Sequence, residues 1–148
     1  MTRRSSAGSD AELVLAVKRA VSRFYARTRS ERPPGDLGDG ALEVLARVEK
    51  YGPNTLTELS DFYRVTPASM SQSVNRLTSS GYAERVRDPA DGRRVLIAAT
   101  DEGAELSVEA RGRRDAWISA HLGALDDADR EVLRRASELL LRMADARE

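Results

Sequence analysis

Hydrophobic residues recur three and four positions apart in several segments of the chain, which predicts amphipathic helices. One such segment covers residues 11–29, and another runs through Leu42, Leu45 and Val48 to Tyr51. Between them, the stretch ERPPGDLGDG is rich in proline and glycine and predicts a loop. The first third of the chain is therefore expected to be two helices joined by an irregular connection.

Two short helices with explicit start signals follow. Thr55, with Glu58 three positions later, has the pattern of a capping box. Thr66 suits the N-cap of the next helix and Pro67 its first turn, while Gly81 suits a left-handed terminator. Because so few residues separate the two helices, the pair predicts a helix-turn-helix.

The hydrophobic period then changes to that of strands. Residues 83–87 and 94–99 are short and rich in strand formers, and the DPADG between them favours a β-hairpin. Acidic residues open a further helix over residues 102–121, and Asp126-Asp127 open a last helix with a long apolar stripe. A helix-turn-helix followed by a hairpin is a winged helix-turn-helix, whose second helix enters the DNA major groove.

The second helix of the pair carries side chains that suit base recognition. Helical spacing places Ser69, Gln72, Asn75 and Arg76 on one face, opposite apolar residues that pack into the domain. Asn and Gln can pair bidentately with adenine, and Arg with guanine. The helix N-terminus offers backbone N–H groups for a phosphate. The alternative interpretation is an ordinary polar surface helix.

Two arginines of the hairpin turn extend the predicted interface, because an exposed arginine beside the recognition helix can enter the narrow minor groove. The alternative interpretation is that these arginines lie in an ordinary solvated hairpin tip. The formal net charge of the chain is zero, but residues 64–94 hold six arginines against three acids, so the basic excess lies in this region. The predicted DNA-binding residues are Thr66, Pro67, Ala68, Ser69, Ser71, Gln72, Asn75, Arg76, Arg93 and Arg94.

Composition makes several other functions unexpected. The 148 residues include no cysteine and one histidine, His121, so disulfides, thiolate chemistry and a histidine-based metal site are not expected. No nucleophile–base pair or convergent carboxylates stand out, so we expect neither an enzyme nor a cofactor. No apolar run approaches the ~18 residues that span a bilayer, and no secretory signal opens the chain. A cytoplasmic protein without membrane contact is expected.

From about Leu42 to Gly103 the sequence resembles the MarR family, the multiple-antibiotic-resistance regulators of bacteria. The end of the helix-turn-helix and the wing carry the resemblance. The matching residues are Gly81-Tyr82 and Glu84-Arg85, then Asp88-Pro89, Asp91-Gly92-Arg93, Val95-Leu96-Ile97 and Thr100. Gly92 departs from the family pattern, in which a second arginine is frequent, so the tip of this wing is expected to be less basic.

The resemblance implies roles for the wing residues and an assembly. Arg93 would be the minor-groove residue, and Asp88 and Asp91 would hold the wing in shape. Members of the family dimerise through their first and last two helices, and the dimers bind palindromic operators. Independently, the apolar stripes of residues 11–29 and 126–144 have no evident cover in a small winged domain, which also suggests a second copy. The alternative is that these helices pack only on each other.

The resemblance also implies a small amphipathic or phenolic effector, bound between the dimerisation helices and the DNA-binding domain. Phe24, Tyr25 and Trp117 are the candidate pocket residues, with core or dimer packing as the more ordinary role for each. Repression is the commoner mode in the family, and activation stays open. The rival function is a winged helix that binds protein partners without reading DNA.

The sequence therefore predicts a mainly α fold with a small β-hairpin wing. Residues 1–10 are expected to be a disordered tail, and residues 11–36 a dimerisation helix and loop. Residues 37–100 would form the winged helix-turn-helix DNA-binding domain, and residues 101–148 the C-terminal dimerisation helices. The function expected is that of a ligand-responsive transcriptional repressor binding double-stranded DNA as a homodimer.

Overall fold

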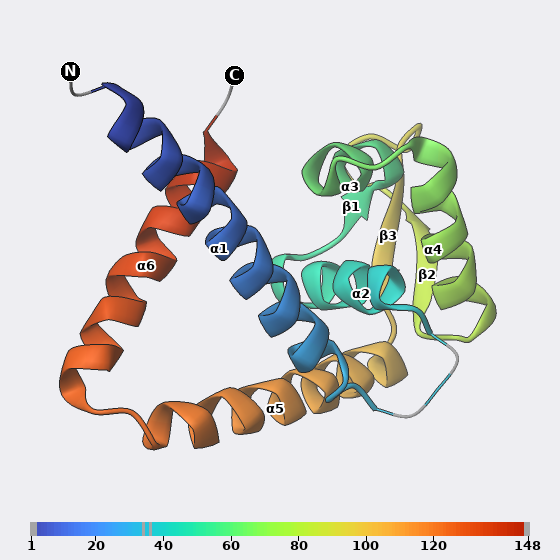
Figure 1. Cartoon of the computed structure of the whole chain (residues 1–148). Helices are drawn as coiled ribbons and strands as arrows, with labels where there is room; N and C mark the ends of the chain where they lie inside the picture. The colour runs from blue at the N-terminus through green and yellow to red at the C-terminus, as the bar shows by residue number, and fades with distance from the viewer. Residues whose placement is uncertain (1–2, 34, 36, 147–148) are drawn as a thin grey trace. The chain divides into compact units, whose positions relative to one another are not determined.

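The computed structural model describes residues 3–33, 35 and 37–146, in which six helices and three strands are formed (Figure 1). The elements are α1 (Arg3–Arg29), α2 (Asp39–Tyr51), β1 (Asn54–Thr55), α3 (Leu56–Tyr63), α4 (Pro67–Ser79), β2 (Ala83–Arg87), β3 (Val95–Ala99), α5 (Asp101–Gly123) and α6 (Asp127–Asp145). The predicted fold class, mainly α with a small β wing, is confirmed. The chain divides into two compact units, one ending at Arg114 and the other beginning at Asp115.

The helix-turn-helix forms where its start signals predict it. The Thr55 hydroxyl accepts the Glu58 N–H at 3.2 Å, and Glu58 accepts the Thr55 N–H at 2.8 Å, so the capping box is complete. Thr66 caps α4 by accepting the Ser69 N–H at 3.2 Å, with Pro67 as the first helical residue. Both caps satisfy backbone donors that would otherwise lack a partner at a helix start.

Left-handed residues end both helices of the pair. Arg64 closes α3 with φ of 51°, and its N–H donates to the carbonyl of Asp61 at 3.3 Å. Gly81 follows α4 with φ of +78°, as predicted. These two residues turn the chain sharply, so α4 lies against α2 and α3 while its N-terminus stays exposed.

The sheet is larger than the predicted hairpin. Strands β2 and β3 pair antiparallel from Ala83↔Ala99 to Arg87↔Val95, which confirms the hairpin, and β1 adds a third strand on the other side of β3. Strand β1 was not predicted from the sequence, because two residues are too few to show a strand period. Pairing of β1 with β3 joins the start of α3 to the wing.

A single hydrophobic core holds the winged domain together. Helices α2, α3 and α4 gather around the sheet (Figure 1), and each contributes side chains with no more than a few per cent of their surface exposed. The core residues are Ala41, Val44, Leu45, Val48, Leu59, Met70, Val74, Leu77, Ala83 and Ile97. Burial on this scale is the main favourable term in folding, so the domain is stabilised within its own chain.

The start of α5 is locked to the winged domain by close backbone contacts. The Thr100 hydroxyl donates to the carbonyl of Gly81 at 2.7 Å, and the Thr100 N–H donates to that of Tyr82 at 3.2 Å. A Cβ on Gly103 would lie 1.9 Å from the Tyr82 carbonyl oxygen, so only glycine allows this approach. These contacts hold the first turn of α5 against the segment that joins α4 to β2.

Helix α1 begins earlier than the hydrophobic period indicated. It starts at Arg3, so helix covers most of residues 1–10, which the sequence predicted as a disordered tail. The cause of the error is that residues 3–10 contain no large apolar side chains, and a period cannot be detected without them. Residues 1 and 2 lie outside the described part of the chain.

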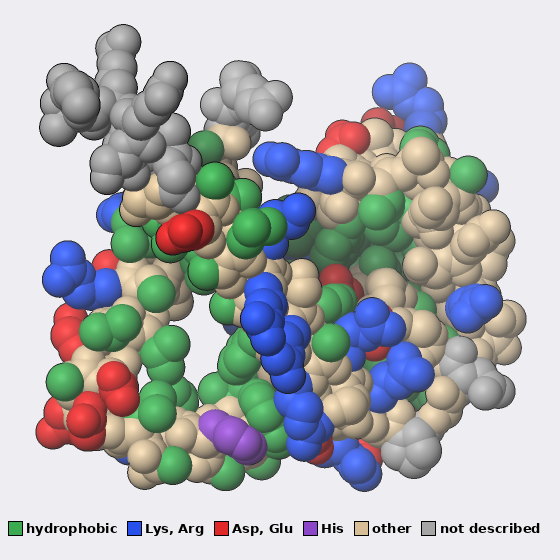
Figure 2. All heavy atoms as spheres, viewed as in Figure 1, with side chains coloured by type: hydrophobic (Ala, Val, Ile, Leu, Met, Phe, Trp, Pro, Cys, Tyr) green, Lys and Arg blue, Asp and Glu red, His purple; other side chains and the backbone are tan. Residues whose placement is uncertain are grey.

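Helix α6 begins as predicted, with the Asp126 carboxylate accepting the Asp129 N–H at 2.8 Å. Unlike α2, α3 and α4, it has no buried residue, and hydrophobic side chains are visible on its surface (Figure 2). The exposed large hydrophobic residues of α6 are Val132, Leu133, Leu139, Leu140, Leu141 and Met143. No helix within the described residues is long and apolar enough to cross a membrane.

Candidate nucleic-acid interface

Helix α4 presents the predicted polar face to solvent. Its apolar residues Met70, Val74 and Leu77 are buried in the core. The opposite face is consequently turned outward, which exposes Gln72 and Arg76. Of the other predicted residues on this helix, Ala68, Ser69 and Asn75 are also exposed, with Thr66 and Pro67 at its start, and Ser71 is partly buried. The surface that results is polar, nearly uncharged and continuous with the helix N-terminus.

The N-terminus of α4 offers fewer free donors than the sequence suggested. Pro67 has no N–H, and the N–H of Ser69 donates to the Thr66 hydroxyl at 3.2 Å. The Thr66 hydroxyl in turn donates to the Ser69 hydroxyl at 3.0 Å. Within this first turn, the Ala68 N–H remains to meet a phosphate.

Arg85 of β2 reaches back to α4, a contact that the sequence analysis did not foresee. Its Nη2 donates to the Asn75 side-chain oxygen at 2.8 Å, and its Nη1 donates to the Thr78 hydroxyl at 3.3 Å. The Glu84-Arg85 pair is part of the motif that resembles the MarR family, but the sequence does not show which residue the guanidinium contacts. The predicted base-reading residue Asn75 is therefore anchored from the wing.

At the wing tip Arg93 is free to reach outward. Its side chain is 93% exposed. Asp91 accepts the Arg93 backbone N–H at 3.1 Å and its Nε at 3.3 Å, which holds the base of the side chain while the rest of the guanidinium faces solvent. Arg87, which the sequence analysis did not single out, donates to the carbonyl of Gly92 at 2.9 Å and ties the tip to β2.

Arg94 has a different environment from Arg93. Its Nη2 lies 2.7 Å from Glu58 of α3, and its Nη1 lies 3.4 Å from Asp88. Asp88 also accepts the N–H of Ala90 at 2.8 Å, so it shapes the turn as well. The pKa of Glu58 is lowered, first by the hydrogen bond from the backbone N–H of Thr55 and further by nearby groups that include Arg94. Arg94 thus links the wing to Glu58 of the capping box at the start of α3.

The predicted effector-pocket residues are not among the residues that line the cavity described below. Phe24 and Tyr25 are on α1, where the Tyr25 hydroxyl donates to Glu43 at 2.6 Å. Trp117 belongs to the second unit and stacks against His121 with ring centroids 4.1 Å apart. No cluster of three or more potential metal-ligating residues occurs in the part of the chain that the structure describes.

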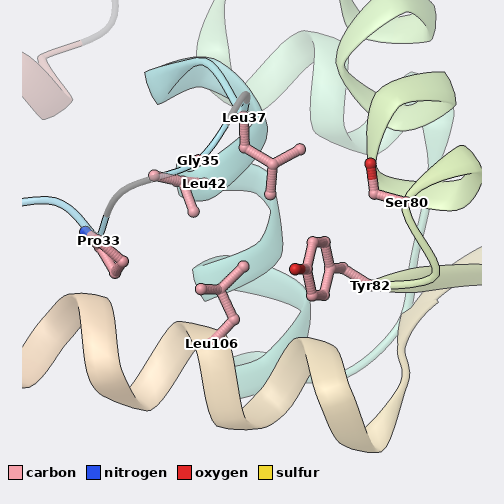
Figure 3. A pocket seen from close by; sticks show the side chains of 7 residues that line it. All are labelled: Pro33, Gly35, Leu37, Leu42, Ser80, Tyr82 and Leu106. Carbon is pink, nitrogen blue, oxygen red and sulfur yellow. The ribbon is translucent and has the colours of Figure 1, made fainter.

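A cavity of about 210 Å³ lies where the end of α4 approaches α2 and α5. In Figure 3 the side chains of Leu37, Leu42, Tyr82 and Leu106 converge on it. Its full lining is Pro33, Gly35, Leu37, Leu42, Ser80, Tyr82 and Leu106. The lining thus combines apolar side chains with the hydroxyl groups of Ser80 and Tyr82.

Comparisons with known proteins agree with this geometry. Residues 37–103 match the winged helix DNA-binding domain family. The chain is 33% identical over 137 residues to an HTH-type transcriptional regulator of Mycobacterium bovis, which covers 93% of this chain and 96% of the relative.

Solved structures extend the similarity to the whole chain. A MarR family protein from Bacillus stearothermophilus superposes with a TM-score of 0.81 at 20% identity, over 99% of both chains. BpsR of Bordetella bronchiseptica, whose DNA binding is regulated by 6-hydroxynicotinic acid, gives a TM-score of 0.71 at 25% identity. That match covers 89% of this chain and 92% of BpsR.

Proposed function

Because the chain belongs to a family of HTH-type transcriptional regulators and has the fold of a MarR family protein, we propose that it is a sequence-specific repressor that binds a pseudo-palindromic operator as a homodimer. The observation that carries the proposal is the outward polar face of α4, with Gln72, Asn75 and Arg76 exposed, together with Arg93 of the wing, whose side chain is 93% exposed. These side chains have the donors and acceptors that read base edges in the major groove and enter the minor groove.

The homodimer is supported by the apolar side chains that the chain leaves uncovered. On α6 these include Leu133 and Leu140, and α1 exposes Leu13, Val14 and Leu15. Apolar stripes of this kind mark interaction surfaces in water. A twofold dimer would place its two recognition helices about one DNA turn apart, ~34 Å, so the operator would carry two inverted half-sites. Such a dimer would repress transcription by excluding polymerase from the DNA, which requires no further residues. The protein would act in the cytoplasm.

An effector is part of the proposal, since the DNA binding of the similar protein BpsR is regulated by a small aromatic acid. For this chain we propose a small amphipathic or phenolic molecule. Phe24, Tyr25 and Trp117 remain the residues predicted to contact it, and the cavity beside Tyr82 and Leu106 is a second location of suitable chemistry. Such a molecule would act by binding more tightly to one spacing of the recognition helices than to the other.

The rival function, a winged helix that binds only protein partners, is disfavoured by the surface of α4 and the wing. A protein-binding surface is depleted of charge at its centre and enriched in aromatic residues. The exposed face of α4 instead carries Gln72 and Asn75, and the helix contains no aromatic residue. The similar proteins are transcriptional regulators rather than enzymes.

Selection of bound duplexes from a random DNA library tests the proposal. It is done at ~0.15 M salt, because affinity for DNA depends steeply on salt. We expect a twofold-symmetric site with half-sites about ten base pairs apart. Gln72→Ala, selected in parallel, should lose preference at one position per half-site. Folded, dimeric protein that enriches no site, before and after unfolding and refolding to remove a carried ligand, would contradict the proposal.

A further inference from the structure

We propose that Arg85 is a positioning residue that sets the orientation of the Asn75 amide and thereby the base that Asn75 reads. The amide would present its NH₂ group to the DNA and select a hydrogen-bond acceptor, such as guanine O6, thymine O4 or a purine N7. It would not make the bidentate contact to adenine that the residue type alone suggests. This inference rests on the proposed function, since it concerns how the recognition helix reads its site.

The geometry begins with two anchors on one side of α4. Arg85 donates from Nη2 to the Asn75 side-chain oxygen at 2.8 Å and from Nη1 to the Thr78 hydroxyl at 3.3 Å. Thr78 uses its own proton on the carbonyl of Asn75 at 3.1 Å, so its oxygen faces Arg85 as an acceptor. The two nitrogens of one planar guanidinium therefore grip residues three positions apart on the helix.

The chemistry of the guanidinium decides which way the amide points. Arginine has only donors, so the Asn75 atom that faces it must be the oxygen and cannot be the nitrogen. A bidentate contact to adenine needs the oxygen and the nitrogen side by side on one base edge. With the oxygen turned toward β2, that arrangement is lost, and the NH₂ group is left to face outward. No acceptor among the described residues bonds this NH₂ group.

Backbone pairing makes Arg85 a firm anchor. It lies in the middle of β2, opposite the buried Ile97 of β3, and β2 and β3 are paired on both sides of this position. The hydrogen bond carries the charge of the arginine, which makes it stronger than one between neutral groups. Asn75 itself is exposed, so without Arg85 its amide could rotate freely between the two orientations.

The experiment compares the sites selected by the wild type, Arg85→Met, Arg85→Lys and Asn75→Ala. The wild-type selection identifies the position read by Asn75 as the one at which Asn75→Ala loses preference. At that position we expect both Arg85 variants to relax preference roughly 3- to 10-fold per half-site, the range for one hydrogen bond. All other positions should keep their preferences. Arg85→Lys keeps the charge, so its salt dependence should match the wild type.

Arg87→Met is the matched control. Arg87 lies on the same strand and has the same side chain, but its guanidinium bonds the carbonyl of Gly92 instead of α4. It should leave the preference at the Asn75 position unchanged. Thermal unfolding of each variant then separates a local change of base preference from general damage to the fold.

Operator analogues test the identity of the acceptor. If Asn75 reads a purine N7, replacing that nitrogen by carbon should weaken wild-type binding by roughly 3- to 10-fold and leave Asn75→Ala unaffected. If the selected base is adenine and removal of its 6-amino group costs as much as removal of N7, the contact is bidentate and the inference is wrong.

The remaining outcomes separate the inference from the function on which it rests. A wild type that enriches no site overturns both. An enriched site whose Asn75 position is read equally well by Arg85→Met overturns the inference alone. So does an Arg85→Met variant that binds every sequence more weakly with a smaller salt slope, because Arg85 would then act only as a positive charge.

Discussion

Helix α4 and helix α6 are both amphipathic and both begin with a side-chain cap, but only α4 buries its apolar face within the chain. In α4, Met70, Val74 and Leu77 have at most 3% of their surface exposed. In α6 the comparable stripe is exposed, with Leu133 at 47%. Similar local patterns thus end in opposite environments. The winged domain is stabilised by its own core, whereas α6 needs a partner, and a second copy of the chain is the one we propose.

Placing charges in the α6 stripe should give the largest effect. We expect Leu133→Asp with Leu140→Asp to leave the winged domain folded but convert the dimer to monomer. Loss of the second half-site should then lower operator affinity by ~10²–10⁴-fold, the gain that linking two binding modules provides. Sedimentation velocity and operator titration measure the two changes. Arg134→Asp, on the other face of α6, is the control and should stay dimeric. A dimeric double variant would contradict the proposed interface.

A cavity in the core of the winged domain should have the next largest effect, and it should lower the stability of the domain rather than its dimerisation. Leu45 is fully buried, so Leu45→Ala should lower the free energy of unfolding by ~2–5 kcal/mol. For a transition confined to this domain, the loss should not depend on protein concentration. Leu133→Ala should instead make the unfolding temperature more dependent on concentration, since it weakens association. Denaturant and thermal unfolding, each at two protein concentrations, distinguish the two variants. If both variants respond to protein concentration in the same way, the contrast between α4 and α6 is wrong.

Within the winged domain, the two neighbouring wing arginines should differ. Arg93→Ala should weaken binding to all DNA sequences and reduce the salt slope by about one unit, as expected when one positive charge no longer faces the DNA. Arg94 is already paired with Glu58 and Asp88, so Arg94→Ala should change the salt slope less and lower the unfolding temperature more. Binding titrations at several salt concentrations, with thermal unfolding, test both. Equal slopes for the two variants would show that their different partners do not matter for DNA binding.

The smallest effect concerns a phenol of the winged domain. Burial, with a contribution from Glu43, raises the pKa of Tyr63 to about 12. The fold thus favours the neutral phenol, whose contribution to stability is complete below pH 10 and is lost as the pH rises through 12. The free energy of unfolding of the wild type should fall over this range more steeply than that of Tyr63→Phe. Tyr51→Phe, at an exposed position, is the control, and a curve for Tyr63→Phe parallel to the wild type would show that Tyr63 does not contribute.

Much of the winged domain could be predicted because its signals are local. The capping box of Thr55 and Glu58, the Thr66-Pro67 start and the Gly81 terminator each depend on residues a few positions apart. The hairpin was found for the same reason. Strand β1 and the first turns of α1 were missed, because a strand of two residues and a helix segment without apolar side chains leave no period to detect.

The candidate site likewise has features that local sequence signals predict and features that depend on the tertiary structure. Sequence alone determined which residues of α4 face outward, because the helical period and the apolar face dictate it. Only the tertiary structure decided what the arginines contact. Arg94 contacts Glu58, 36 positions away in the sequence, and Arg85 contacts Asn75, 10 positions away, whereas Arg93 bonds the nearby Asp91 and stays exposed. A guanidinium bonds any acceptor within its reach, and folding alone determines which acceptor that is.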